Sequence, residues 1–262
     1  MKANRNHLKM AVLTLMTMAF SQVVGAAAHS YKMGGEEADG YLAVPKKASG
    51  KMPAVLIIHD WMGPSEFTQK KADEIAELGF VALAADIYGK GKHPKDPKEA
   101  AALSGKYKAG DRADLRARVL AAYNELKSVK GVDPNKIVVM GYCFGGTTAL
   151  ELARSGADIA GVASFHGGLS NPNPASAKNI KAKALIMHGA IDPYVPADEV
   201  AAFQKEMNDA GVDYQFIAYS GAVHAFAIPS AGNDIKTGVA YNAMADHRSW
   251  TEFKNFMKEI TQ

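Results

Sequence analysis

Short, fully apolar runs recur along most of the chain and alternate with longer stretches of helical periodicity. Runs of this kind, bounded by glycine and polar residues, are typical of strands that are buried on both faces. Their alternation with helices predicts an α/β fold, a doubly wound and mostly parallel sheet with helices on both faces. The predicted strands are 54–58, 81–85, 137–140, 162–165, 185–187 and 214–219.

Apolar residues at helical spacing predict helices between these strands. The predicted helices are 65–78, 111–127, 197–210 and 241–260. Two of them end at a glycine, Gly79 and Gly211, which is a common helix stop signal. The segment 89–110 is rich in lysine and glycine and interrupts the rhythm. We predict that this segment is a loop with a short helix that lies over the functional site.

The first 28 residues differ from the rest of the chain. Basic residues precede the apolar run 10–20, and the small residues 25–28 resemble a signal-peptidase cleavage site. A membrane anchor is the alternative, but the apolar run is shorter than the roughly 20 residues that span a bilayer. We therefore expect a cleavable signal peptide over 1–28, one mature domain over 29–262, and a secreted or periplasmic location.

Composition fits a single globular domain with little net charge. A chain of 262 residues with 48% hydrophobic content can bury one large core. The chain has 30 basic and 27 acidic residues, and three of the basic ones lie in 1–28, so the expected mature domain has 27 of each sign. Without a basic surface we expect no nucleic-acid partner, and no stable membrane association after signal cleavage.

The strongest chemical signal is the segment Gly141-Tyr142-Cys143-Phe144-Gly145-Gly146, which joins a predicted strand to a helix-like stretch. Its glycines allow a sharp turn that places Cys143 at a helix N-terminus, where backbone N–H groups and the helix dipole stabilise a thiolate or an oxyanion. A cysteine that only packs beneath a helix is the alternative. Cys143 is the only cysteine, and in an oxidising compartment this favours a reactive thiol.

Two further residues follow later strands of the predicted sheet. Asp192 lies just after 185–187, and His224 lies just after 214–219. Each has a simpler explanation, because Asp-Pro often shapes a turn and a single histidine often occupies a loop. The chain order of nucleophile, acid and histidine is nevertheless the order of α/β-hydrolases. Together with Cys143, these residues predict a catalytic triad at the carboxyl edge of the sheet.

The chain resembles the dienelactone hydrolase family, a branch of the α/β-hydrolases with a cysteine nucleophile. The resemblance lies in residues 55–63, 83–88, 141–146, 189–192 and 221–226. It implies the α/β-hydrolase fold. It also implies that Cys143 is the nucleophile, Asp192 the acid and His224 the base. The family further implies an oxyanion hole formed by the backbone N–H groups of Trp61 and Phe144. We also predict that Tyr88 and Phe226 belong to the substrate pocket.

The sequence departs from the family pattern at two places. Asp60 stands where members commonly have a glutamate that contacts and tunes the thiol. The segment Ala225-Phe226-Ala227-Ile228 stands where the dienelactone hydrolases proper have an arginine that binds the substrate carboxylate. The nearest basic candidates in the sequence are Lys90, Lys92 and His93, which would otherwise be part of a solvated loop.

These features predict an enzyme that cleaves a small-molecule ester or lactone through a covalent thioester. A carboxylesterase or thioesterase for another acyl substrate is the alternative, and a non-catalytic binding protein is a further one. No cofactor and no metal are expected, because the histidines are scattered and one cysteine cannot build a thiolate zinc site. His59, His166 and His188 follow predicted strands, where we expect turn or supporting roles.

Overall fold

The computed structural model describes residues 25–47 and 50–261. Most of the predicted signal peptide, residues 1–24, lies outside this part of the chain, so its cleavage stays a prediction. Ala27 and Ala28, at the end of that predicted segment, begin strand β1 (Ala27–Met33). Among the described residues, no helix combines the length and the apolar character needed to cross a bilayer.

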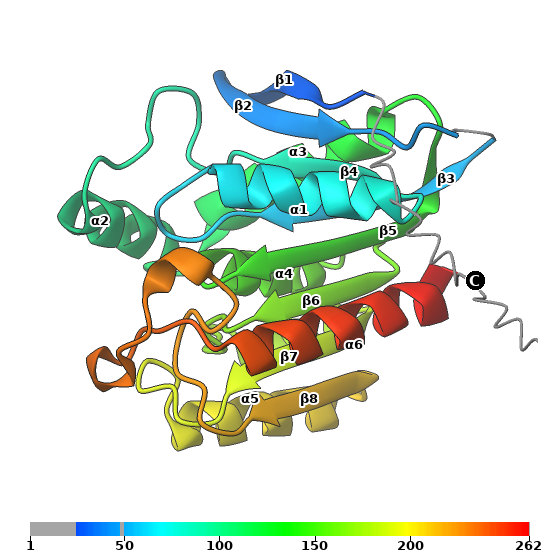
Figure 1. Cartoon of the computed structure of the whole chain (residues 1–262). Helices are drawn as coiled ribbons and strands as arrows, with labels where there is room; N and C mark the ends of the chain where they lie inside the picture. The colour runs from blue at the N-terminus through cyan, green and yellow to red at the C-terminus, as the bar shows by residue number, and fades with distance from the viewer. Residues whose placement is uncertain (1–24, 48–49, 262) are drawn as a thin grey trace, which may run out of the picture.

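An eight-stranded sheet forms the centre of the fold, with the strand order β1-β2-β4-β3-β5-β6-β7-β8 (Figure 1). Strands β1 and β2 pair antiparallel, β2 pairs antiparallel with β4, and all other neighbours are parallel. The remaining strands are β2 (Glu36–Ala43), β3 (Met52–Ile58), β4 (Val81–Ala85), β5 (Val132–Tyr142), β6 (Gly161–Phe165), β7 (Lys183–Gly189) and β8 (Tyr214–Tyr219). The predicted doubly wound, mostly parallel sheet is confirmed.

The edge hairpin of β1 and β2 is the part of the sheet that the apolar runs do not reveal. Buried and more exposed positions mix along β2, and its sequence carries Glu36, Glu37 and Asp39. Such a strand belongs to the partly solvated edge of a sheet, whereas β4 is buried at every position. Charged side chains on the outer strands also discourage edge-to-edge pairing with other chains.

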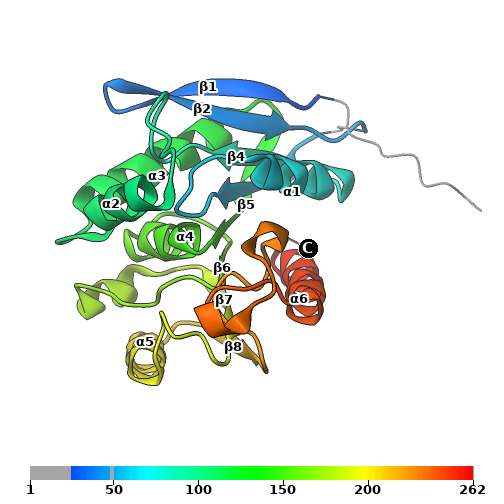
Figure 2. The same cartoon turned by 60° about the vertical axis from the view of Figure 1, so that its left-hand side comes forward.

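Six α-helices cover the described sheet in two layers, as Figure 2 shows. Helices α1 (Glu66–Glu77) and α6 (Ala243–Thr261) lie on one face. Helices α2 (Pro97–Lys108), α3 (Ala113–Ser128), α4 (Phe144–Arg154) and α5 (Ala197–Ala210) lie on the other. Short 3₁₀ turns occupy Pro174–Asn179, Pro229–Ala231 and Ile235–Thr237.

Two apolar cores follow from this layering. Phe253, Phe256 and Met257 of α6 belong to one buried cluster with Ile57 of β3 on one face, so the aromatic side of the last helix is buried. On the other face, Leu115 and Val119 of α3 pack with the opposite side of the sheet, in a second cluster. The sheet is therefore buried on both faces, and its loops after the parallel strands are the free edge where a site can form.

The segment 89–110, predicted to be a loop with a short helix, contains helix α2. Asp96 caps the helix by accepting a hydrogen bond from the Glu99 N–H at 2.8 Å, and Pro97 occupies its first position. Figure 1 shows α2 at the end of a long connection that leaves β4.

Candidate active site

Cys143 occupies a strained turn between β5 and α4. Its φ is 53° and its ψ is −113°, a conformation that costs free energy for a residue with a Cβ. Glycine is required two positions before and two positions after Cys143, because backbone atoms of neighbouring segments lie very close to Gly141 and Gly145. A Cβ on Gly141 would lie 2.1 Å from the Gly145 carbonyl oxygen, and a Cβ on Gly145 would lie 2.3 Å from that of Ile58. The turn therefore holds the half-buried thiol at the helix N-terminus, as predicted.

The structure brings Cys143, His224 and Asp192 together in a hydrogen-bonded line. His224 Nε2 lies 3.0 Å from Cys143 Sγ, and His224 Nδ1 lies 2.8 Å from Asp192 Oδ2. The other carboxylate oxygen of Asp192 accepts the Tyr194 N–H at 2.8 Å. These side chains come from the loops after β5, β7 and β8, so parallel strands deliver them to one edge of the sheet.

The imidazole of His224 is placed to hold a positive charge. Burial lowers its pKa, but the hydrogen bonds to Asp192 and to Cys143, and the negative charges there, raise it to about 10. The side chain of Asp192 is fully buried and faces this ring. At neutral pH the arrangement therefore favours a proton on His224, in the position between Asp192 and the Cys143 sulfur.

Backbone contacts and two rings fix the position of His224. The His224 N–H donates to the Gly238 carbonyl at 3.2 Å, and the His224 carbonyl accepts the Ala240 N–H at 3.1 Å. The rings of Tyr194 and His166 each meet the His224 ring edge to face, with centroids 5.4 Å apart. The base is thus held from the backbone and from its ring faces.

Asp60 and Trp61 follow β3 and share one cavity with Cys143. The Asp60 carboxylate accepts the Met62 N–H at 2.8 Å. Burial raises the pKa of Asp60, and the Met62 N–H and the positive charge of His224 oppose that rise. Asp60 therefore acts on the site as a charge near His224, and its hydrogen bond goes to the backbone.

Two buried rings hold this loop in place. His59 donates from Nδ1 to the Asp60 carbonyl at 2.6 Å and accepts the Ile87 N–H at Nε2 at 3.1 Å. Burial lowers the pKa of His59 to about 4, so this ring is neutral. The Tyr88 hydroxyl donates to the Trp61 carbonyl at 2.8 Å. These contacts fix the orientation of the peptide bonds on either side of Trp61. The Trp61 N–H is the group that would donate a hydrogen bond to an oxyanion.

The cavity beside Cys143 has a volume of about 480 Å³. Its lining is mainly apolar and includes Met62, Ala101, Val195, Ala225, Ile228, Ala231 and Val239. Besides His224, the charged residues along it are Asp60 and Lys108. Such a surface suits a small substrate with apolar groups.

The two residues predicted to line the substrate pocket do not line the cavity. Tyr88 and Phe226 are fully buried and stand behind the cavity, because Tyr88 packs against Phe144 and Phe226 packs against His166. We correct their predicted role to support of the residues that line the cavity. Sequence reasoning missed Lys108, since its place beside the cavity follows from how α2 docks.

The three basic candidates from the sequence have acidic neighbours outside the cavity. Lys90 lies 3.4 Å from Glu37, Lys92 pairs with Glu36, and His93 Nε2 lies 3.4 Å from Asp86. The two lysine contacts tie the start of the long connection to β2, and the His93 contact ties it to the residue after β4. They do not supply an anion-binding group for the site.

Comparison with known proteins adds to this geometry. The sequence pattern of the dienelactone hydrolase family matches residues 38–261. The chain belongs to the dienelactone hydrolase family. This confirms the resemblance seen in the sequence, and it makes the chain a member of a hydrolase family with the α/β-hydrolase fold.

Individual relatives cover nearly the whole domain. A protein of Aquifex aeolicus (strain VF5) named for carboxymethylenebutenolidase is 31% identical over 232 residues, which are 87% of this chain and 96% of the relative. A Bradyrhizobium protein, named as a probable 2-oxo-3-(5-oxofuran-2-ylidene)propanoate lactonase, is 30% identical over 73% of this chain and 80% of its own length. The crystal structure of P91 from metagenomic libraries, described as a dienelactone hydrolase-like promiscuous phosphotriesterase, is 35% identical. It superposes with a TM-score of 0.87 over 92% of this chain and all of its own.

Proposed function

We propose that this chain hydrolyses ester or lactone bonds through a Cys143–His224–Asp192 triad and a covalent thioester. The hydrogen-bonded line from Sγ through the imidazole to the carboxylate, at 3.0 Å and 2.8 Å, carries this proposal. Membership of the dienelactone hydrolase family supports it.

In the first half of the reaction, the thiol proton passes to His224 Nε2 and the thiolate attacks the carbonyl carbon. The resulting oxyanion accepts hydrogen bonds from the N–H groups of Trp61 and Phe144, both on the cavity beside Cys143. The Phe144 N–H belongs to the first residue of α4, where a helix leaves its N–H groups without intrahelical acceptors. Collapse of the intermediate breaks the carbon–oxygen bond, and His224 gives its proton to the leaving alcohol.

In the second half, water replaces the alcohol in the site. His224 takes a proton from that water, which attacks the thioester carbonyl through a second oxyanion. The carbon–sulfur bond then breaks, and the thiolate–imidazolium pair forms again as the carboxylic acid leaves. Asp192 holds His224 by Nδ1 throughout, so Nε2 remains free to carry the proton.

The cavity favours substrates with apolar groups near the reacting carbonyl. Its lining is mainly apolar, and the segment Ala225–Ile228 supplies no cation. A carboxylate-bearing lactone would therefore lack the bidentate partner that an arginine provides. We propose neutral esters and lactones as the preferred substrates.

A neutral phosphotriester is a second candidate substrate, favoured by this cavity and by the likeness to P91. The thiolate would attack phosphorus, expel one alcohol or phenol and leave a phosphorylated sulfur for hydrolysis by water. The same triad would move the protons.

The predicted mature protein, residues 29–262, is assayed against a panel of substrates to test this function. The panel contains p-nitrophenyl esters of rising chain length, neutral and anionic lactones, an acyl thioester and diethyl p-nitrophenyl phosphate. We expect turnover of neutral esters and lactones, and loss of turnover in Cys143→Ala and His224→Ala with unchanged far-UV circular dichroism. A wild-type protein without activity on the whole panel would instead support a binding role.

Export from the cytoplasm is also a proposal, carried by the signal-like sequence of 1–28. Fractionation of cells that produce the full chain, with N-terminal sequencing of the mature protein, tests it. Recovery of the uncut chain in the cytoplasm would contradict it.

A further inference from the structure

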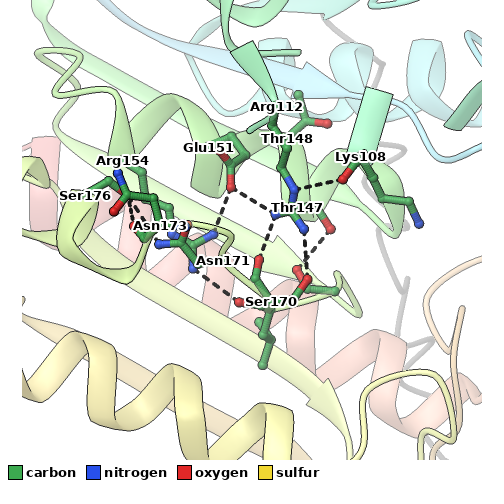
Figure 3. Close-up of polar contacts among 12 residues, drawn as sticks. Lys108, Arg112, Thr147, Thr148, Glu151, Arg154, Ser170, Asn171, Asn173 and Ser176 are labelled. Carbon is green, nitrogen blue, oxygen red and sulfur yellow. Dashed lines mark hydrogen bonds and ion pairs between the residues drawn. The ribbon is translucent and has the colours of Figure 1, made fainter. Parts of the chain in front are cut away.

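Arg112, which the mechanism does not use, joins three segments of the chain with one buried guanidinium group. Its side chain is 7% exposed. Nη1 donates to the Glu151 carboxylate at 3.0 Å and to the Ser170 carbonyl at 2.7 Å, and Nη2 donates to Ser170 Oγ at 2.9 Å. Nε donates to the Lys108 carbonyl at 3.3 Å. Figure 3 shows Arg112 between Lys108, Glu151 and Ser170.

We call Arg112 and its contacts with Lys108, Glu151 and Ser170 the clasp. Two of the segments that the clasp joins, α2 and the loop after β6, form part of the wall of the cavity beside Cys143. On the α2 side, Ala101, Ser104 and Lys108 line it. On the other side, Thr147 and Gly168 line it, and the Thr147 hydroxyl donates to the Gly168 carbonyl at 2.9 Å. Arg112 thus connects both parts of the wall from behind, without lining the cavity itself.

The backbone of Arg112 is held in an unusual conformation. Its φ is 61°, a left-handed conformation that costs free energy for a residue other than glycine. The fork of N–H donors reaches two carbonyls, a hydroxyl and a carboxylate at once, which a lysine cannot do. Contacts of the guanidinium therefore compensate for a strained corner between α2 and α3.

Charge balance does not require Arg112 in particular. The Glu151 carboxylate also pairs with Arg116 at 3.0 Å and with Arg154 at 3.2 Å. Removing Arg112 therefore leaves this buried carboxylate with two cationic partners. The hydrogen bonds that link the Lys108 carbonyl to Ser170 through the guanidinium would be lost, and the other two arginines would not replace them.

Helix α2 is also held by its buried face and by Arg118, whose guanidinium lies 4.7 Å from the centre of the Tyr107 ring. Its buried residues are Ala100, Ser104 and Tyr107, and Tyr107 stacks on Tyr88 with centroids 5.8 Å apart. The stacking fixes one face of the last turn, and Arg112 holds the end of the helix. Arg112 therefore supplies the link from the end of α2 to the loop after β6.

We propose that Arg112 is a positioning residue that sets substrate size selectivity by fixing the α2 wall of the cavity against the loop after β6. The ligand class is an ester whose acyl chain is long enough to reach from the carbonyl at Cys143 to α2. This inference rests on the proposed ester hydrolysis. The triad is built from other loops, so thiol reactivity does not depend on Arg112.

The test compares Arg112→Lys with the matched control Arg116→Lys. Arg116 pairs with the same Glu151 carboxylate but contacts neither Ser170 nor the Lys108 carbonyl. We expect Arg112→Lys to raise KM for p-nitrophenyl hexanoate about tenfold at unchanged kcat, since small misplacements far from the chemistry weaken binding geometry. KM for p-nitrophenyl acetate and the iodoacetamide alkylation rate of Cys143 should stay within about twofold, as should every parameter of Arg116→Lys.

Ser170→Ala is a milder second variant that removes only the Nη2–Oγ bond, and it should shift KM for the hexanoate in the same direction by about twofold. Hydrogen exchange adds a readout that needs no turnover. Amides of 97–108 should exchange faster in Arg112→Lys than in wild type or Arg116→Lys.

Unchanged exchange and unchanged KM for the hexanoate would overturn the proposal. Equal losses on acetate, hexanoate and alkylation would also overturn it, because they would show a general structural role. A wild type that hydrolyses neither ester refutes the proposed function instead, and hydrogen exchange then still decides whether Arg112 holds α2.

Discussion

The ring of His166 meets the ring of His224 edge to face, with centroids 5.4 Å apart, and His166 is fully buried. Burial and the charge of His224 hold the pKa of His166 well below its usual range, so this ring stays neutral. Neither ring nitrogen of His166 has a hydrogen-bond partner among the described residues. A neutral ring beside the base supports it by shape and does not compete for its proton.

His166→Phe tests this relationship. Phenylalanine keeps an aromatic edge against His224 and removes two buried nitrogens without partners, so we expect the free energy of unfolding to rise by about 1 kcal/mol. Activity and its pH profile should be retained. Urea unfolding and ester kinetics measure both. A large loss of kcat would show that a nitrogen of His166 takes part in the reaction.

Asp192→Asn should remove most of the activity while the fold stays intact. The amide cannot hold His224 in the required tautomer or stabilise its charge, and the analogous change in a serine triad costs about 10⁴-fold in kcat. Steady-state ester hydrolysis and far-UV circular dichroism check this. Activity within tenfold of wild type would mean that Asp192 only shapes the turn before Pro193.

The stability of the fold should depend on the charge of His224. Its pKa is raised to about 10 in the folded state from 6.5, so the folded state binds the proton more tightly than the unfolded state. The stabilisation is fully present below pH 6.5 and is lost as pH rises through 10. The difference in free energy of unfolding between wild type and His224→Gln should shrink from pH 6 to pH 10, by urea titration. A difference that is constant with pH would contradict the assigned charge.

Asp60→Asn tests whether this carboxylate tunes the thiol. Burial raises the pKa of Asp60, and the positive charge of His224 opposes that rise. The two groups therefore attract, and a charged Asp60 favours the protonated imidazole. The variant should alkylate more slowly with iodoacetamide at pH 7 and show a shifted pH profile. Because Cys143 is the only cysteine, the alkylation reports on this site alone. An unchanged profile would remove Asp60 from the mechanism.

Gly145→Ala should damage the elbow at Cys143. The new Cβ would lie 2.3 Å from the Ile58 carbonyl oxygen and 2.6 Å from that of His59, so the turn must shift. We expect a loss of about 1–3 kcal/mol in the free energy of unfolding and a fall in kcat. Thermal unfolding and ester kinetics measure these effects.

Gly105→Ala in α2 is the control for this substitution. A Cβ at Gly105 meets nothing within 4 Å, so alanine should stabilise the helix by about 0.5–1 kcal/mol. Normal activity in Gly145→Ala would mean that the elbow tolerates displacement of the thiol.

Local patterns in the sequence predict the main elements well, because fully buried strands such as β4 are apolar at every position. They also identify Cys143, Asp192 and His224, since each lies just after a recognisable strand. Strand β2, which lies next to the edge strand β1, escapes this approach because polar residues occupy much of it. Tertiary packing decides the rest.

The cavity and its clasp could not be predicted from local patterns. Lys108 lines the cavity because α2 packs beside it. Arg112 bonds to Ser170, which lies 58 residues later in the sequence. Tyr88 illustrates the opposite error. Its place just after a predicted strand indicates a pocket residue. In the structure its hydroxyl donates a hydrogen bond to the Trp61 carbonyl, and its ring is buried.

The central claim is a thioester on Cys143, and intact-mass spectrometry after acid quench tests it most directly. During turnover of a slowly hydrolysed ester such as p-nitrophenyl pivalate, we predict one acyl group per chain. Peptide mapping should place it on Cys143, and Cys143→Ala should carry none. Ester turnover by Cys143→Ala, or an acyl group on any other residue, would contradict the account.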